Sequence, residues 1–185
     1  MVQDIITKTK EQMSKTVDFC ASQLGKIRTG RASTSLLDGV MVDMYGTLGP
    51  ISNAASVSTP DARSIIVQPW DKSLLSAIER AIHQADLGFN PQNDGTLLRI
   101  PVPPLTEERR KEFVKMSKKI AEEAKIALRN IRRDTNESLK KIEKSKEISE
   151  DDRKKGEDEV QKITDQFIKN VDTLQEKKEK ELLQD

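Results

Sequence analysis

The sequence predicts an α+β protein: a three-helix bundle with a small α/β, β-sandwich-like domain inserted between its first and second helices. Charged residues make up 34% of the 185 residues and aromatic residues only 3%, which suits long helices with narrow apolar stripes better than one broad core. Three long segments have apolar residues at helical spacing, and strand and turn patterns separate the first from the second. Since none of these helices can bury its stripe alone, we expect them to pack together.

The first predicted helix spans residues 3–28. Its apolar residues recur at spacings of three, four and seven; they are Ile6, Met13, Val17, Cys20, Leu24 and Ile27. The pattern stops at Thr29 and Gly30, where glycine permits a helix-ending backbone conformation. Cys20 is the only cysteine, so no internal disulfide is possible, and its place on the stripe predicts a buried small hydrophobe.

Residues 31–104 are expected to form the inserted domain from a strand, a second strand, a helix and a third strand. Alternating side chains at 40–45 before a glycine predict a strand and a turn, and the β-branched run at 64–67 predicts the second strand. Residues 73–87 place their apolar side chains on one helical face, and residues 96–102 follow an Asn-Asp-Gly turn. Residues 1–30 and 105–185 are then left for the bundle.

Two further helices follow the inserted domain. Thr106 is a candidate N-cap for a helix that continues to about Ser145 without proline or glycine. Its expected core stripe consists of Phe113, Ser117, Ile120, Ala124, Ala127, Ile131, Ser138 and Ile142. The last helix opens at Ser149-Glu150-Asp151-Asp152, a capping sequence. Its expected stripe consists of Val160, Ile163, Phe167, Val171, Leu174 and Leu182.

The second helix is strongly basic. Residues 109–146 carry fourteen Lys or Arg and six Asp or Glu, a net +8 inside a chain whose total is +1, so this segment can attract polyanions. On a helical wheel the core stripe lies opposite Arg129, Arg132 and Arg133, and Lys125 and Asn136 extend the arginine face by one turn in each direction. Guanidinium groups along a rigid rod suit a phosphate backbone, because each can hold a phosphate with two hydrogen bonds.

Two interpretations of this basic face remain open. The first is binding to structured RNA, read by backbone and shape, since no aromatic residues are interleaved to stack on single strands. The second is a solvated helix face, whose arginines pair with Asp134 and Glu137 and with the acidic last helix. A third class, an adaptor whose bundle binds another protein, also fits the composition.

Enzymatic chemistry is not expected. His83 is the only histidine and lies on a predicted amphipathic helix, so neither a metal site nor a Cys–His pair is indicated. The glycines lack the spacing of a phosphate-binding loop, and no cofactor is implied. No apolar run could span a bilayer and the N-terminus lacks a signal-peptide core, so we expect a soluble, cytoplasmic protein that makes no membrane contact.

Short blocks along nearly the whole chain resemble the bacterial ribosome recycling factor family in their order and spacing. The blocks are Ile27-Arg28-Thr29-Gly30-Arg31-Ala32-Ser33, Leu36-Leu37, Tyr45-Gly46-Thr47, Ala85-Asp86-Leu87-Gly88, Asn90-Pro91, Pro103-Pro104-Leu105-Thr106-Glu107-Glu108-Arg109-Arg110-Lys111, Arg129-Asn130-Ile131-Arg132-Arg133-Asp134 and Lys146-Glu147-Ile148-Ser149-Glu150-Asp151. Thr34 departs from the family pattern, because many members have proline there.

The resemblance implies an L-shaped monomer of transfer-RNA-like dimensions that binds the 70S ribosome. Its bundle would lie on large-subunit RNA across the acceptor-end regions of the A and P sites. Elongation factor G with GTP would move the smaller domain and split the post-termination ribosome into subunits, releasing mRNA and tRNA, with initiation factor 3 acting downstream. The residues expected to bind ribosomal RNA are Arg129, Arg132, Arg133, Arg110, Arg109, Arg28 and Arg31.

A hinge is expected where the two domains join. The hinge residues would be Thr29, Gly30 and Arg31 on one connection and Pro103, Pro104 and Leu105 on the other. Glycine gives backbone freedom on the first, and the paired prolines hold the second extended. The alternative is that Gly30 is only a helix C-cap and the prolines only a helix start.

Overall fold

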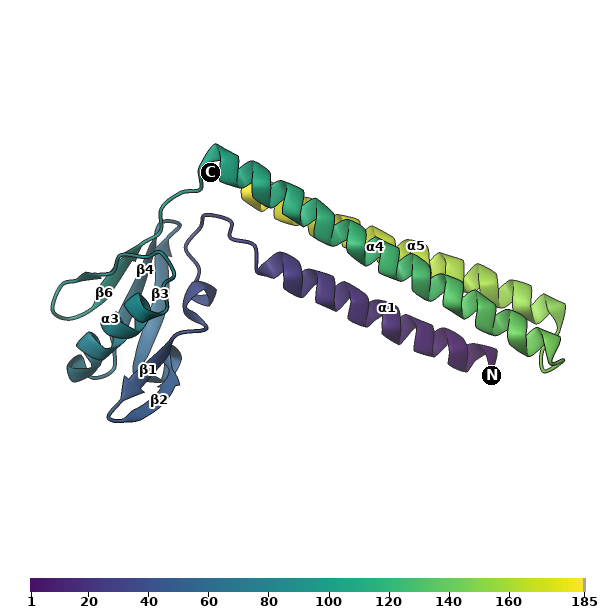
Figure 1. Ribbon diagram of the computed structural model, residues 1–185, viewed down its shortest axis with the longest axis horizontal. Helices are drawn as coiled ribbons and strands as arrows, with labels where there is room; N and C mark the ends of the chain where they lie inside the picture. Colours follow the sequence, from purple (N-terminus) through teal and green to yellow (C-terminus); the bar gives the residue numbers. More distant parts are fainter. Residues whose placement is uncertain (185) are drawn as a thin grey trace. The chain divides into compact units, whose positions relative to one another are not determined.

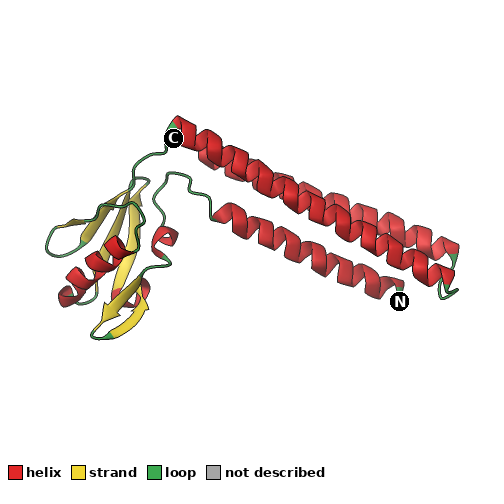
Figure 2. Cartoon of the chain, in the orientation of Figure 1, coloured by secondary structure: helices red, strands yellow, loops and turns green. Residues whose placement is uncertain are grey.

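A computed structural model describes residues 1–184, and the chain divides into two compact units. The first consists of Met1–Thr29 together with the chain from Glu107 onward, and the second is Gly30–Thr106. Long helices make up the first unit, and the second holds the strands (Figures 1 and 2). The predicted α+β class is therefore confirmed.

Three helices, α1 (Val2–Gly25), α4 (Glu107–Lys144) and α5 (Glu150–Leu183), pack side by side in the first unit (Figure 1). Helix α4 has 38 residues, a length of ~57 Å at 1.5 Å per residue. The bundle core consists mainly of Ile6, Met13, Cys20, Leu24, Leu128, Leu139, Val160, Val171 and Leu182. The prediction for Cys20 is confirmed, since it is 1% exposed and burial raises the pKa of its thiol.

The first helix is shorter than predicted. It ends at Gly25, and the backbone N–H of Ile27 then donates to the carbonyl of Leu24 at 3.1 Å, a three-residue reach that tightens the last turn. Ile27 is still buried, at 6% exposure, which explains why its position continued the apolar pattern. The alternative in which Gly30 caps this helix is wrong, because Gly30 lies five residues beyond the last helical residue.

The core stripe predicted for α4 is wrong in detail. The buried residues of this helix are Ser117, Ala121, Ala124, Leu128, Thr135 and Leu139, whereas Ile120, Ala127 and Ile131 are only half-buried. When a helix packs against two others, its most deeply buried residues lie on the line that faces the space between the two neighbours. Small side chains on this line allow the helices to approach closely. There the hydroxyls of Thr9 and Thr135 lie 2.8 Å apart. The isoleucines flank this line, and the true core centre is rotated toward Arg132.

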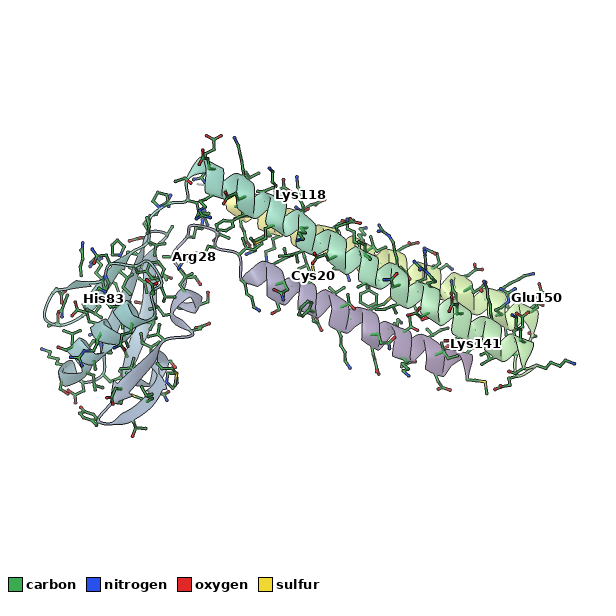
Figure 3. The ribbon with its side chains drawn as sticks, in the orientation of Figure 1. Cys20, Arg28, His83, Lys118, Lys141 and Glu150 are labelled. Carbon is green, nitrogen blue, oxygen red and sulfur yellow. The ribbon has the colours of Figure 1, made fainter. Side chains whose placement is uncertain are left out.

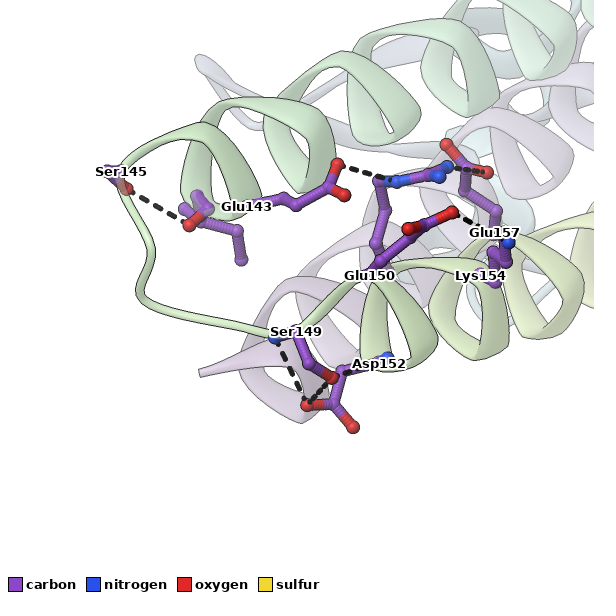
Figure 4. A network of polar contacts seen from close by, with 9 residues as sticks. Glu143, Ser145, Ser149, Glu150, Asp152, Lys154 and Glu157 are labelled. Atoms are coloured by element: carbon purple, nitrogen blue, oxygen red, sulfur yellow. Dashed lines mark hydrogen bonds and ion pairs between the residues drawn. The ribbon is translucent and has the colours of Figure 1, made fainter.

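Helix α5 begins with the predicted cap. The Ser149 side chain accepts a hydrogen bond from the backbone of Asp152, and the Asp152 carboxylate accepts one in return from the backbone of Ser149 (Figure 4). Nearby, Arg153 joins the two helices: its Nε lies 2.7 Å from Glu143 Oε2 and its Nη1 lies 2.7 Å from Glu157 Oε2. These contacts fix the reversal of the chain between α4 and α5.

Replacing Ser149 with alanine should lower the free energy of unfolding by about 1 kcal/mol at neutral pH. The Ser149 hydroxyl and backbone N–H hold the pKa of Asp152 below its usual value. The Asp152 carboxylate therefore stabilises the folded state above about pH 4. This stabilisation is lost as the pH falls through the lowered pKa of Asp152 in the folded state. Urea unfolding should show a smaller difference between parent and Ser149→Ala at pH 3 than at pH 7. Ser22→Ala, on the exposed side of α1, serves as the control; a difference that grew at low pH would contradict this account.

The second unit contains two sheets around one core. Strands β1 (Met41–Met44) and β2 (Thr47–Pro50) form one antiparallel pair. The other sheet has the order β3-β4-β6-β5, all antiparallel; its strands are β3 (Ala55–Asp61), β4 (Ser64–Pro69), β5 (Gln92–Asn93) and β6 (Leu98–Pro101). The unit also has the helices η1 (Thr34–Leu37), α2 (Ile51–Ala54), η2 (Lys72–Leu74) and α3 (Leu75–Gln84). Its core includes Val42, Ile65, Ile78, Leu98 and Ile100.

The three predicted strands and the helix exist, but three further strands were missed. Strand β3 lies at a sheet edge, where its polar side chains and Pro60 are tolerated, so neither alternation nor an apolar run marks it. Strand β2 pairs with β1 across a two-residue turn in which Tyr45 and Gly46 both have positive φ, at 54° and 88°. That geometry is typical of tight hairpins. Strand β5 has two residues, too few to leave a pattern.

Candidate nucleic-acid interface

Exposed basic side chains form a ridge along one side of α4. The ridge consists of Lys111, Lys115, Arg129, Arg133, Lys140 and Lys144, all exposed. Their spacings of four, seven and fourteen residues keep them within about 60° of one another around the helix. This cationic ridge runs most of the length of a 38-residue helix, and Glu122, which pairs with Arg129, lies on the same side.

The two arginines of the cationic ridge keep donors available for a ligand. Arg129 is 46% exposed, and its Nη1 lies 3.2 Å from Glu122 Oε1. Arg133 donates from Nη2 to the side-chain oxygen of Asn130 at 3.3 Å, a contact with a neutral group. A guanidinium has five N–H donors, so these single contacts leave most of them free to bind phosphate.

Arg132 does not point away from the core as the helical wheel suggested. It is half-buried and donates from Nη1 to the side-chain oxygen of Gln161 on α5, at 2.9 Å. The reason is the rotated core: with Leu128 and Thr135 buried, Arg132 stands at the edge of the α4–α5 contact. Only Arg129 and Arg133 of the three arginines belong to the outward ridge.

Lys118 and Lys125 lie in the same contact between α4 and α5. Lys118 Nζ is 3.4 Å from Glu179 Oε1, and Lys125 forms an ion pair with Asp172. Lys125 is only 20% exposed, so the prediction that it extends an exposed face is wrong. For these two lysines the interpretation of charges paired across the bundle is the correct one. Figure 3 labels Lys118 on the upper side of α4.

Asn136, the other residue expected to extend the face, is half-buried. Its side-chain oxygen is enclosed and has no hydrogen-bond partner within the described part of the chain. It lies one turn beyond Arg132, so it belongs to the α4–α5 contact rather than to the cationic ridge.

The remaining predicted arginines are spread over the chain. Arg109 and Arg110 lie in the first turn of α4, about 30 Å along the helix from Arg129. Arg109 Nη1 is 3.0 Å from Glu112, and Arg110 is half-buried. Arg28 is exposed just after α1 (Figure 3), and Arg31 is exposed in the second unit.

Within the second unit, its two connecting segments lie beside each other. Gly30 has a φ of +76°, and a Cβ added there would be 3.1 Å from Leu105 Cγ and 3.2 Å from Leu105 N. The turn between β3 and β4 holds both segments. Its Ala62 carbonyl accepts from Ala32 N–H at 2.8 Å, its Arg63 carbonyl accepts from Val102 N–H at 2.7 Å, and the Arg63 side chain donates to the Gly30 carbonyl at 3.4 Å.

His83 is exposed near the end of α3 (Figure 3). Across residues 1–184 no cluster of three or more His, Cys, Asp or Glu side chains is arranged to hold a metal ion. None of the helices in that range combines the length and the apolar character needed to cross a bilayer.

Comparison with known proteins shows the family of the chain. The model of the family described as ribosome recycling factor matches residues 20–183. The chain belongs to the ribosome recycling factor family. It is 54% identical to the ribosome-recycling factor of Oleidesulfovibrio alaskensis over 180 residues, covering 97% of this chain and 98% of the relative. It is 52% identical to that of Listeria monocytogenes over 184 residues, covering 100% of both.

Solved structures agree with this membership. A solution structure of a ribosome recycling factor aligns with a TM-score of 0.77 at 38% identity, over 98% of this chain and 97% of that one. A second match has a TM-score of 0.64 at 45% identity over 100% of both chains. It comes from models for the T. thermophilus ribosome recycling factor and the E. coli elongation factor G bound to the E. coli post-termination complex.

Proposed function

We propose that this ribosome recycling factor binds the post-termination ribosome and, with elongation factor G and GTP, promotes its dissociation into subunits and the release of mRNA and tRNA. The observation that carries the proposal is the match of the whole chain, both units included, to a relative described on a post-termination complex with elongation factor G. The helical unit would bind large-subunit RNA and the second unit would transmit the motion.

The cationic ridge of α4 supports the RNA-binding part of the proposal. Ribosomal RNA presents a dense array of phosphates, and Arg129 and Arg133 retain unused donors directed to solvent. In the first turn of α4, Arg109 and Arg110 extend the basic surface toward the connecting segments. Arg28, just after α1, and Arg31, at the start of the second unit, add further positive charge.

The chain itself would act as a ligand of the ribosome rather than as an enzyme, with GTP supplied to elongation factor G. It would work as a monomer in the cytoplasm, and initiation factor 3 would act on the products. This assignment needs no catalytic group or cofactor in the chain.

Light scattering of post-termination complexes tests the proposal directly. Purified protein, elongation factor G and GTP should together reduce scattering as 70S particles split, and omission of any one of them should leave the signal unchanged. Co-sedimentation with ribosomes should weaken as salt rises. The adaptor function would be favoured instead if the chain bound another protein without ribosomes, if this binding persisted in high salt, and if no splitting occurred.

We further propose that the paired connecting segments act as a hinge. The β3–β4 turn holds Ala32 and Val102 by backbone hydrogen bonds, so bending would concentrate outside these points, in residues 27–31 and 103–106. Thr29, Gly30 and Arg31 lie in the first of these stretches, and Pro103, Pro104 and Leu105 in the second. Within these two stretches, Gly30 is the position with a left-handed backbone, which disfavours any other residue.

Replacing Gly30 with alanine should slow subunit splitting while ribosome binding is retained. The left-handed backbone costs a non-glycine residue about 1–2 kcal/mol, and the new methyl would press on Leu105. Both effects should shift the distribution of interdomain distances, measured by fluorescence energy transfer between labels on the two units. Gly25→Ala is the matched control, since a Cβ there meets nothing within 4 Å. Normal splitting by Gly30→Ala with a shifted distance distribution would contradict the hinge.

A further inference from the structure

The contact between α4 and α5 contains a regular ladder of charges. On α4 its cations are spaced by seven residues, at Lys118, Lys125 and Arg132, and on α5 three acids have the same spacing, at Asp165, Asp172 and Glu179. The first two cations pair directly with Glu179 and Asp172. The antiparallel register of those two pairs places Asp165 opposite Arg132.

The third step of the ladder is built differently. Arg132 donates to the side-chain oxygen of Gln161 at 2.9 Å, and Gln161 in turn donates from Nε2 to Asp165 Oδ1 at 2.8 Å. Among residues 1–184 Arg132 forms no ion pair with a carboxylate. A neutral amide therefore stands between the cation and the acid that would otherwise neutralise it.

The direction of the amide follows from its two partners. An amide oxygen and nitrogen have nearly the same shape, so only their hydrogen bonds decide which faces which neighbour. The Asp165 carboxylate only accepts, and so it holds the Gln161 nitrogen; the Arg132 guanidinium only donates, and so it holds the oxygen. Each contact enforces the other, and together they fix the position of the guanidinium.

We infer that Gln161 and Asp165 are positioning residues that hold Arg132 for an RNA phosphate while leaving its positive charge uncancelled. Arg132 uses one of five donors on Gln161, and the residues three and four positions away on α4 are Leu128, Arg129, Thr135 and Asn136, none of them acidic. A carboxylate at position 161 would hold Arg132 equally well but would cancel the charge. This inference rests on the proposed binding of ribosomal RNA.

The decisive variant is Gln161→Glu, which keeps an acceptor for Arg132 but makes it anionic. It should weaken binding to 70S ribosomes about tenfold at 0.1 M salt, because one cation no longer displaces a counterion, and should reduce the slope of log affinity against log salt by about one. Arg132→Gln should have a similar effect. Gln166→Glu, the same change at an exposed site on α5, is the control and should bind as the parent does. Circular dichroism would establish that all variants remain folded.

A double-variant cycle separates positioning from simple surface charge. In the Arg132→Gln background, Gln161→Glu should cause no further loss, because the cation that it neutralises is already absent. An equal loss in that background, or an equal loss from Gln166→Glu, would overturn the inference. If Gln161→Glu bound ribosomes as the parent does and Arg132→Gln did not, the positioning role would be overturned but RNA binding by Arg132 would stand. If Arg132→Gln bound as the parent does, both the positioning role and RNA binding by Arg132 would be overturned.

Discussion

A protein in which residues 31–104 are replaced by a short flexible linker should bind ribosomes but fail to split them. The linker would join Gly30 to Leu105, which are neighbours in the intact protein. Each unit has buried apolar residues of its own, those of α1, α4 and α5 in the first unit and a cluster from Leu37 to Val102 in the second. The truncated bundle should therefore fold, retain the cationic ridge and compete with the full protein for ribosomes.

The expected loss of splitting is complete rather than partial, since the part proposed to move with elongation factor G is gone. Light scattering with elongation factor G and GTP measures it, and co-sedimentation at several salt concentrations measures the retained binding. An excess of the truncated bundle added to full-length protein should inhibit splitting. Normal recycling by the truncated bundle would show that the second unit is dispensable, and the proposed division of roles would be wrong.

Most of the fold follows from local patterns that the sequence shows directly. The three long helices have apolar residues at helical spacing, and the start of α5 is marked by a Ser149–Asp152 cap that the structure contains. The edge strand β3 could not be predicted in this way, because its stability comes from pairing with β4 rather than from its own side chains. Its polar sequence and Pro60 are typical of a loop.

The basic face could be predicted only in part, for a geometric reason. A helical wheel shows which side chains face outward only when the direction of the core is known. The isoleucines of α4 indicated a core direction that lies to one side of the buried line through Leu128 and Thr135. Arg129 and Arg133 remain outside after this rotation, but Arg132 moves into the contact with α5. Gln161 was missed because its role depends on that contact. The seven-residue spacing of cations on one helix and acids on the next was a signal that could have revealed the ladder.

Reversing both exposed arginines, Arg129→Glu with Arg133→Glu, should weaken ribosome binding about 100-fold. A charge-assisted hydrogen bond contributes about 1.5 kcal/mol or more, and two of them correspond to roughly two orders of magnitude in affinity. Both side chains are exposed, and among residues 1–184 their contacts are with Glu122 and Asn130 on the same helix. The bundle should therefore unfold at nearly the parent temperature.

Salt dependence distinguishes lost phosphate contacts from damage to the fold. The slope of log affinity against log salt should fall by about two in the reversed variant, so that parent and variant converge at high salt. The matched control is Lys162→Glu with Lys169→Glu, which makes the same change in net charge at exposed positions on α5. An equal loss in that control would mean that net charge alone governs binding. Parent-like affinity of the reversed variant at low salt would show that the cationic ridge of α4 is not the surface that meets ribosomal RNA. The interface would then have to be sought among the other candidate arginines, which are Arg28, Arg31, Arg109, Arg110 and Arg132.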